Sequence, residues 1–325
     1  MKGLQITQPG QYEIVDVPRP EPYPDEVVVE VKACNSCTHW DLTVWDGIDI
    51  FGRAGHPEYP YYVGGPGHEL AGMVVERGDQ VTALNVGDKV ALWGSPPGAR
   101  PLRKGRAYGG YVQYFATHER SVLPFLDGLS WREMGMLEML SCVCQGVVKA
   151  GDLTGQRVAV SGLGAAGLMM LQALQTLGPD SLTAIDVQPD RCALALSLGA
   201  ERAVQPGLKE WQDLREDEFT VAVDCSGVPA AIEGDLEHTA GRLIIFSVPE
   251  ADFRVPQSSR RRGTSIEYTR TPAGRPGKYA RHLLVSGQVN VKPLLSVEMP
   301  IEEFARGLDL LRRREAIKVS FTLGN

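Results

Sequence analysis

The sequence is poor in cysteine, has no long apolar run and carries no excess of positive charge. Only six cysteines occur among 325 residues, too few for a disulfide framework, so each is expected to be a core thiol, a metal ligand or a redox group. No stretch reaches the roughly 18 consecutive apolar residues that a transmembrane helix needs. The first residues also lack the apolar core of a signal peptide. We therefore expect a cytoplasmic protein.

Charge and composition exclude further classes. A formal net charge of -7 gives no electrostatic reason to expect a nucleic acid or an anionic membrane as a partner. Hydrophobic residues make up 43% of the chain and charged residues 22%, which is ordinary for a globular protein and argues against disorder. The length predicts two domains at roughly 100–200 residues each, and the chain shows no internal repeat.

The hydrophobic period changes along the chain. Residues 1–120 contain short alternating segments separated by turns, which predicts a β-rich domain, and no helical pattern precedes Trp131. Beyond Trp131, helical patterns alternate with apolar strands, and this predicts a parallel sheet covered on both faces. The expected helices are 134–150, 168–177 and 301–313, and the expected strands are 157–161, 182–186, 221–224, 242–246 and 317–323.

A glycine fingerprint follows the strand 157–161. Its residues are Gly162-Leu163-Gly164-Ala165-Ala166-Gly167, and they open the helix 168–177. The first glycine permits a tight turn, the second lets the backbone approach a pyrophosphate, and the third allows close packing of helix on strand. The helix N-terminus attracts the anion. Taken alone, the pattern is also typical of a structural turn.

Asp186 makes the fingerprint more specific. It ends the strand after the glycine loop, where a carboxylate accepts hydrogen bonds from the adenosine ribose hydroxyls. A carboxylate there also repels the 2′-phosphate of NADP, so NAD is the expected cofactor. The alternatives are that Asp186 only caps a turn and that Arg191 meets a phosphate.

Candidate metal ligands lie in the first half of the chain. Cys34-Asn35-Ser36-Cys37 fits a redox dithiol, half of a structural zinc site, or one catalytic ligand beside a bystander. Gly67-His68-Glu69 adds further ligands, and Glu138 lies in an apolar run where an unpaired carboxylate is costly to bury. No second C-x-x-C exists. One Cys, one His and one Glu leave the fourth position of a tetrahedron open, as a catalytic zinc needs, although a core histidine and a solvated glutamate are the alternatives.

Together these motifs resemble the zinc-containing medium-chain dehydrogenases/reductases, which include alcohol, sorbitol and threonine dehydrogenases. The resemblance covers nearly the whole chain. It rests on the Cys37 segment, on the glycine fingerprint with Asp186, and on four further segments. These are Gly67 to Val74, Val86 to Val90, Val223 to Gly227 and Ile301 to Leu323.

The resemblance implies an α/β protein with a GroES-like β-barrel catalytic domain and a Rossmann domain with a doubly wound parallel sheet. We expect residues 1–140 to form the catalytic domain, 141–266 the NAD-binding Rossmann domain, and 267–325 to return to the catalytic domain. The implied partners are a small alcohol or ketone substrate and further copies of the chain, as a homodimer or homotetramer.

The resemblance also implies one catalytic zinc on Cys37, His68 and Glu138. Glu69 corresponds to a carboxylate that approaches Glu138 in the metal shell or replaces it. A glutamate at position 138 is similar to that of polyol-type members, which suggests a secondary alcohol, polyol or cyclitol as substrate. The expected bystanders are Cys34, Cys142 and Cys144.

Three features depart from the family pattern. The stretch 94–108 contains no cysteine, so the family's four-cysteine structural zinc is expected to be absent. The usual C-G-T/S-D motif is replaced by Cys37-Thr38-His39-Trp40-Asp41, which leaves Thr38 and His39 as alternative proton relays. Aromatic and imidazole groups crowd the segment before His68, where a substrate cleft, core packing and a subunit contact are all open. They are Phe51, His56, Tyr59, Tyr61 and Tyr62.

Two basic clusters have no counterpart in the family pattern and suit a solvated surface, an anionic substrate or a subunit interface. They consist of Arg100, Arg103, Lys104 and Arg106, and of Arg260, Arg261, Arg262, Arg270 and Arg275. The expected function is zinc-dependent hydride transfer between NAD and an alcohol/ketone pair. The alternatives are a zinc-free NADPH-dependent enone or quinone reductase on the same fold and a non-catalytic nucleotide-binding protein.

Overall fold

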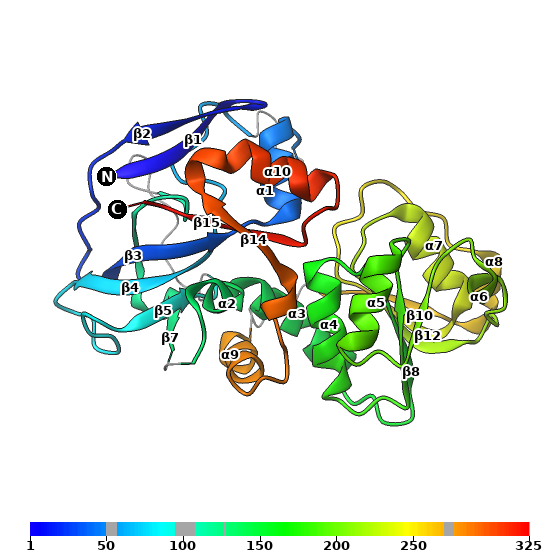
Figure 1. The fold of residues 1–325 in the computed structure, drawn as a ribbon. Coiled ribbons are helices and arrows are strands. Elements are labelled where there is room, and N and C mark those ends of the chain that lie inside the picture. Colours follow the sequence, from blue (N-terminus) through cyan, green and yellow to red (C-terminus); the bar gives the residue numbers. More distant parts are fainter. Residues whose placement is uncertain (50–56, 95–107, 126–127, 270–275, 325) are drawn as a thin grey trace. The chain divides into compact units, whose positions relative to one another are not determined.

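The computed structural model describes residues 1–49, 57–94, 108–125, 128–269 and 276–324. The chain divides into two compact units (Figure 1), one formed by Met1–Met139 and Val291–Asn325 and the other by Leu140–Asn290. The sequence predicts that the chain returns to the first domain at residue 267, whereas in the structure it returns to the first unit at Val291. The reason is that the last strand of the second unit's sheet extends to Tyr268 and that the helix Gly277–Val285 also belongs to this unit.

The first unit is built on a mostly antiparallel sheet. Its strands are β1 (Lys2–Gln8), β2 (Gln11–Asp16), β3 (Glu26–Asn35), β4 (Glu69–Arg77), β5 (Lys89–Leu92), β6 (Tyr114–His118), β7 (Val122–Pro124), β14 (Leu295–Pro300) and β15 (Lys318–Thr322). The order is β14-β15-β3-β4-β5-β7, with β6 also paired to β3, and β1 and β2 form a separate hairpin. β14 and β15 run parallel, and the other pairs run antiparallel. The predicted β-rich first domain is confirmed.

Helix α1 (Thr38–Asp46) corrects the expectation that no helix precedes Trp131. It begins at its N-cap Cys37 and ends at Gly47, whose φ of 75° is the left-handed conformation that glycine adopts readily. Its Thr, Trp and Val residues have modest helix propensity, so its sequence gives little helical signal. Burial of Val44 and Trp45 shows that packing stabilises it.

The predicted helix 134–150 is two helices. α2 (Trp131–Gly135) starts with a capping box in which Ser130 and Glu133 exchange hydrogen bonds, and α3 (Leu137–Ala150) follows after Met136. Near the C-terminus, α10 (Phe304–Arg312) is preceded by the short 3-10 turn Ile301–Glu303. Two other 3-10 turns are Glu119–Ser121 and Lys292–Leu294.

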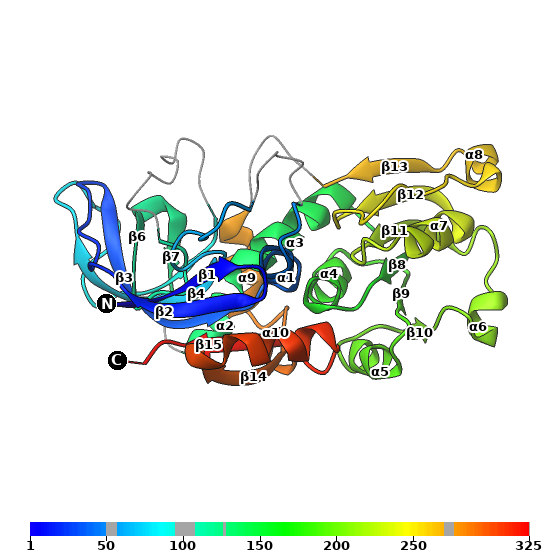
Figure 2. The ribbon, with the colours of Figure 1, turned by 90° about the horizontal axis from the view of Figure 1, so that it is seen from above.

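The second unit has a six-stranded parallel sheet with the order β10-β9-β8-β11-β12-β13 (Figure 2). Its strands are β8 (Arg157–Ser161), β9 (Ser181–Ile185), β10 (Arg202–Val204), β11 (Phe219–Asp224), β12 (Thr239–Ile245) and β13 (Ser265–Tyr268). Numbered within the sheet, this is the doubly wound order 3-2-1-4-5-6, so the chain changes direction between β8 and β11. The predicted doubly wound parallel sheet is confirmed.

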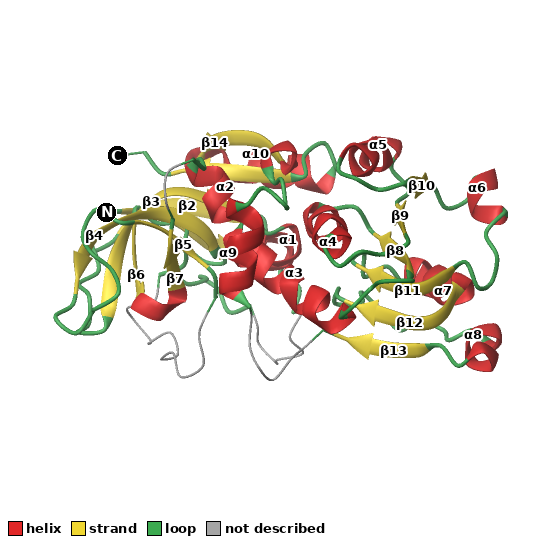
Figure 3. Ribbon diagram, turned by 90° about the horizontal axis from the view of Figure 1, so that it is seen from below, coloured by secondary structure: helices red, strands yellow, loops and turns green. Residues whose placement is uncertain are grey.

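Helices connect these strands (Figure 3). They are α4 (Ala165–Gln175), α5 (Pro189–Ser197), α6 (Lys209–Gln212), α7 (Pro229–His238) and α8 (Gln257–Arg262), and α9 (Gly277–Val285) follows the last strand, β13. Right-handed crossovers on the two sides of the switch point put α4 and α5 on one face of the sheet and α7 and α8 on the other. Among the helices of the described ranges, none combines the length and the apolarity that crossing a bilayer requires.

Candidate metal centre and dinucleotide site

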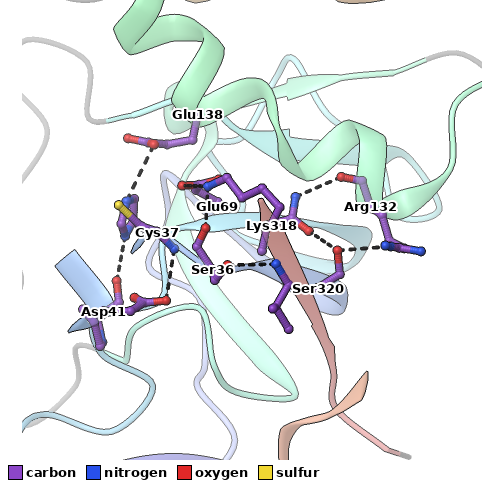
Figure 4. Close-up of polar contacts among 12 residues, drawn as sticks. Ser36, Cys37, Asp41, Glu69, Arg132, Glu138, Lys318 and Ser320 are labelled. Atoms are coloured by element: carbon purple, nitrogen blue, oxygen red, sulfur yellow. Dashed lines mark hydrogen bonds and ion pairs between the residues drawn. The ribbon is translucent and has the colours of Figure 1, made fainter. Parts of the chain in front are cut away.

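Donor groups from separate segments of the first unit converge at one place (Figure 4). Cys37 lies between β3 and α1, His68 immediately precedes β4, and Glu138 lies in the first turn of α3. The Nε2 atom of His68 is 3.8 Å from Oε2 of Glu138. One donor atom each from Cys37, His68 and Glu69 lie within 4.8 Å of one another. Zinc bond lengths of about 2.0–2.3 Å place tetrahedral donors about 3.3–3.8 Å apart. The separation between His68 and Glu138 falls in this range, and the limit of 4.8 Å on the other donors is close enough for small side-chain shifts to reach it.

The His68 ring is held in the orientation that a metal ligand needs. Its Nδ1 atom lies 2.7 Å from the carbonyl oxygen of Pro66. A carbonyl only accepts hydrogen bonds, so Nδ1 carries the proton and donates it. Nε2 then faces Glu138 and is the nitrogen left for a metal to bind after it displaces the Nε2 proton, and such an outer contact on Nδ1 fixes the tautomer of metal-binding histidines.

The charges around His68 attract a cation. Burial lowers the pKa of His68, but the carboxylate of Glu138 and the sulfur of Cys37 outweigh burial and raise this pKa to about 10. Glu138 is only 5% exposed, and a buried carboxylate needs a positive partner. The donor set is one thiol, one imidazole and one carboxylate, and this set suits zinc. The residues present therefore fit a zinc ion.

Glu69 faces a different partner. Lys318 Nζ lies 2.6 Å from both carboxylate oxygens of Glu69 and also donates to the carbonyl of Ser36. Both side chains have no exposed surface. Burial raises the pKa of Glu69, while the charge of Lys318 opposes this rise. Both oxygens of Glu69 are thus engaged by Lys318, whereas His68 Nε2 faces Glu138.

A second hydrogen-bond network joins the strands β3 and β15 to helix α2 near the donor groups (Figure 4). The Asn35 side chain accepts a hydrogen bond from Ser320 Oγ at 2.6 Å and donates to the Arg132 carbonyl at 2.9 Å. Arg132 Nε donates back to Ser320 Oγ at 3.1 Å. Because Asn35 and Ser320 face each other across β3 and β15, the network holds α2 against the strands that carry Lys318 and the Cys37 segment.

Sequence reasoning missed Lys318, Asp41 and Tyr111. Asp41 is fully buried. Its Oδ2 atom accepts hydrogen bonds from the backbone N–H of Cys37 at 3.0 Å and from the Tyr111 hydroxyl at 2.5 Å. Burial raises the pKa of Asp41 to about 6. Two signals were available in the sequence. Lys318 is the one charged residue of a strand that is almost wholly buried, and Asp41 lies one position later than the family's usual motif predicts.

The two proton-relay candidates lie on the surface. Thr38 and His39 are both exposed in the first turn of α1, directly after Cys37. Trp40 follows them, and its ring lies 4.8 Å from the His68 ring, measured between centroids. Trp40 therefore flanks the metal-ligand cluster, and Thr38 and His39 face solvent.

The predicted bystander cysteines lie in different surroundings. Cys34 and Cys144 are buried, and Cys142 is half-buried. Burial raises the pKa of Cys34 well above its usual range and raises that of Cys144 to about 12. A thiol with so high a pKa stays protonated at neutral pH, so neither is suited to ligate a metal or to react as a thiolate.

The aromatic and basic groups divide between core and surface. Tyr59 donates to the carbonyl of Val44, and Tyr61 and Tyr62 lie with ring centroids 4.5 Å apart.

Arg262 donates to the carbonyls of Leu236 and Glu237 at the end of α7, so it caps that helix. Arg260 and Arg261 are exposed. The remaining predicted residues lie outside the described ranges: Phe51, His56, Arg100, Arg103, Lys104, Arg106, Arg270 and Arg275.

Of the three fingerprint glycines of the second unit, Gly162 and Gly167 have no room for a side chain, and Gly164 borders open space. Gly162 has φ 82°, and a Cβ there would lie 2.6 Å from the Ser226 nitrogen. A Cβ on Gly167 would lie 1.9 Å from the Gly162 oxygen, whereas one on Gly164 would meet nothing within 4 Å. The loop is thus a tight turn with close helix packing and an open middle. Gly164 is the N-cap of α4, which follows with Ala165 and Ala166, so free N–H groups and the helix dipole face this opening.

Asp186 lies beside this loop. Its Oδ2 accepts from the Leu163 N–H at 2.7 Å, and its Oδ1 accepts from the Gln188 N–H at 2.8 Å. A carboxylate has about four acceptor positions, so each oxygen can accept a further hydrogen bond from a ribose hydroxyl. Arg191 is half-buried in the first turn of α5. The residues at the switch point therefore fit a dinucleotide.

Two family models match the chain. The alcohol dehydrogenase GroES-like domain matches residues 23–127, and the zinc-binding dehydrogenase domain matches residues 165–271. The first match falls in the first unit and the second in the parallel-sheet unit. The expected fold class, a GroES-like domain with a Rossmann domain, is confirmed.

Several known dehydrogenases are similar over their full length. Sorbitol dehydrogenase of Halalkalibacterium halodurans is 29% identical, with 99% of each chain covered. L-threonine 3-dehydrogenase of Caldanaerobacter subterraneus is 28% identical, with 98% of this chain and 99% of that protein covered. The crystal structure of 2R,3R-butanediol dehydrogenase from Bacillus subtilis superimposes with a TM-score of 0.84 at 24% identity and covers 99% of each chain.

Proposed function

On the premise that this chain belongs to the zinc-containing medium-chain dehydrogenase/reductase family, we propose that it is a zinc-dependent oxidoreductase that transfers hydride between NAD and an alcohol/ketone pair. The observation that carries the proposal is that His68 has a donor atom within 4.8 Å of one from Cys37, while its Nε2 atom lies 3.8 Å from Glu138. Three such donors leave one position of a tetrahedron for substrate oxygen, as in catalytic zinc sites.

Glu138 is the resting third ligand in this proposal. Both oxygens of Glu69 are bound by Lys318, so Glu69 would have to give up a buried ion pair before it could bind a metal. Glu138 Oε2 lies 3.8 Å from Nε2 of the ligand His68, so a zinc ion bound to His68 would lie beside this carboxylate. The absence of cysteine from the stretch 94–108 supports a single zinc per chain without a structural one.

The residues of the chain divide the chemistry among them. Zinc on these ligands would act as a Lewis acid toward the alcohol oxygen. The C–H bond of the alcohol breaks with its electron pair, which goes to the nicotinamide ring, and the hydroxyl proton goes to solvent. Thr38 and His39 lie directly after Cys37 and are exposed, so either side chain can pass this proton outward, and His39 has the more suitable unperturbed pKa.

The second unit would hold the cofactor. Gly162, Gly164 and Gly167 shape the loop, and the N-terminus of α4 at Ala165 and Ala166 would bind the pyrophosphate. Asp186 would bind the adenosine ribose, with Arg191 beside it. The carboxylate of Asp186 favours NAD over NADP, because it would lie against the 2′-phosphate.

Substrate class follows from the relatives and from Glu138. Sorbitol and butanediol dehydrogenases among the similar proteins support a secondary alcohol, polyol or cyclitol. A panel of polyols, cyclitols, vicinal diols and simple secondary alcohols should be tested with NAD by following absorbance of the reduced nicotinamide. We expect NAD reduction with members of this panel and its loss after zinc removal.

Two outcomes would contradict this function. Reduction of enones or quinones with NADPH by zinc-free protein would favour a zinc-free reductase. Tight NAD binding without turnover of any alcohol would favour a non-catalytic binding protein.

A further inference from the structure

Tyr111 lies fully buried in the loop before β6, and its ring belongs to the aromatic core of the first unit. Its ring centroid is 5.3 Å from that of Phe304 and 5.6 Å from that of Phe321, both in edge-on geometry. Rings packed in this way have little freedom to shift. Tyr111 is therefore a fixed point from which neighbouring segments can be held.

The hydroxyl end of Tyr111 holds the Cys37 segment. It donates to Asp41 Oδ2 at 2.5 Å, and the same oxygen accepts the backbone N–H of Cys37 at 3.0 Å. Asp41 has no exposed surface, so water does not compete for this oxygen. The chain of contacts from Tyr111 through Asp41 thus ends on the amide of a proposed zinc ligand.

The backbone and ring of Tyr111 hold the His68 segment. A Cβ on Gly67, the residue before His68, would lie 2.8 Å from Cγ, Cδ2 and N of Tyr111. The Tyr111 N–H donates to the Gly64 carbonyl at 3.0 Å, and the Gly110 N–H donates to the Gly67 carbonyl at 2.6 Å. The loop that carries His68 therefore rests directly on Tyr111, and only glycine fits at position 67.

We propose that Tyr111 is a positioning residue that holds Cys37 and His68 at the separation that zinc requires, acting through Asp41 on one side and Gly67 on the other. The inference rests on the proposed function, because it concerns the same metal site. Donors held in place before the metal arrives lose less conformational freedom on binding. Outer-shell partners of metal ligands commonly change metal affinity by about 10–100-fold when they are replaced.

The sharpest test is Tyr111→Phe, which removes one hydroxyl and keeps the packed ring. Tyr12→Phe is the matched control, because the Tyr12 ring also packs against Phe304, with centroids 5.7 Å apart, and its hydroxyl donates to the Glu302 carbonyl, away from the ligand segments. Zinc affinity is measured by chelator competition. Cobalt(II) replacement adds a spectroscopic readout, since its absorption bands respond to the sulfur–metal distance and to ligand geometry.

We expect Tyr111→Phe to weaken zinc binding by about 10-fold or more and to shift the cobalt spectrum, while Tyr12→Phe leaves both unchanged. Asp41→Asn should give the same two changes, and the double variant should be no worse than the more affected single variant, because both act through one path. Both readouts are taken on protein whose circular dichroism matches wild type.

Unchanged zinc affinity and cobalt spectrum in Tyr111→Phe would overturn the inference, since a purely structural hydroxyl would lower thermal stability only. Additive losses in the double variant would overturn it as well. If the wild-type protein bound no zinc, the proposed function itself would fail. If the wild type bound zinc and Tyr111→Phe bound it equally well, only the inference about Tyr111 would fail.

Discussion

Lys318 Nζ lies 2.6 Å from both carboxylate oxygens of Glu69, and neither side chain has any exposed surface. The two residues come from β15 and from the start of β4 and are 249 residues apart in the chain. The pair joins the returning C-terminal segment to the segment that carries His68. It also occupies the carboxylate that would otherwise compete with Glu138 for a metal.

Lys318→Met leaves the Glu69 charge buried without a partner. We expect it to lower the free energy of unfolding of the first unit by about 3–5 kcal/mol, as for other broken buried pairs. Denaturant titration of the metal-free protein measures this. Arg19→Met is the control, because the Arg19–Glu76 pair at 3.6 Å is exposed and such pairs contribute about 0–1 kcal/mol. Equal effects of the two substitutions would contradict the account, and Lys318→Met/Glu69→Gln should recover most of the loss.

Glu138→Gln tests whether Glu138 or Glu69 is the carboxylate that binds zinc. A carboxamide is a poorer ligand than a carboxylate, so we expect zinc affinity to fall by about 100-fold or more. This loss equals or exceeds the largest loss expected when a hydrogen-bond partner of a ligand is replaced. NAD-linked turnover should fall with it. The double variant Lys318→Met/Glu69→Gln is the matched control and should retain zinc. If the control loses zinc and Glu138→Gln keeps it, Glu69 is the ligand.

Zinc binding should depend on pH through His68. The pKa of His68 is raised from its usual value of 6.5 to about 10 in the protein without metal, so a metal must displace this proton below pH 10. We expect the apparent Kd for zinc to fall by at least about tenfold per pH unit between pH 7 and 9. Chelator competition across this range measures it, and an affinity independent of pH would contradict the assignment of His68.

The same pKa shift predicts how the metal-free fold responds to pH. A histidine whose pKa is higher in the folded state stabilises the fold below its unfolded value of about 6.5. This contribution is lost as the pH rises through about 10. Thermal unfolding of metal-free protein should therefore move to lower temperature over that window.

Asp186→Asn tests cofactor choice. The asparagine keeps one acceptor oxygen but removes the negative charge that would lie against a 2′-phosphate. We expect the ratio of kcat/KM for NAD to that for NADP to fall by about 10-fold, or about 1.4 kcal/mol. Asp190→Asn is the control, since Asp190 is exposed four residues further on. An unchanged ratio would mean that Asp186 does not select the cofactor.

The sequence predicted the second unit more fully than the first. Strand–helix alternation and the glycine loop before α4 are local signals, and the right-handed crossover rule converts them into a sheet order. In the first unit, α1 escaped prediction because its nine residues include few strong helix formers and carry only a weak amphipathic pattern.

Some residues of the candidate site can be predicted from the sequence, and others become apparent only in the folded structure. Cys37 and His68 belong to recognisable motifs and Glu138 lies in an apolar run, so a single sequence is enough to propose them as ligands. The contact between Lys318 and Glu69 spans 249 residues, and no local pattern links the two positions. Asp41 and Tyr111 are joined only by tertiary packing, so their hydrogen bond becomes visible only in the folded structure.

Metal content per chain tests the central claim most directly. Wild-type protein purified without chelator should contain about one zinc per chain. Cys142→Ser should contain the same amount, because Cys142 is half-buried like Cys37 but is not a proposed ligand, whereas Cys37→Ser should lose the zinc. No zinc in the wild type, or equal zinc in Cys37→Ser and wild type, would contradict a catalytic zinc centre on Cys37, His68 and Glu138.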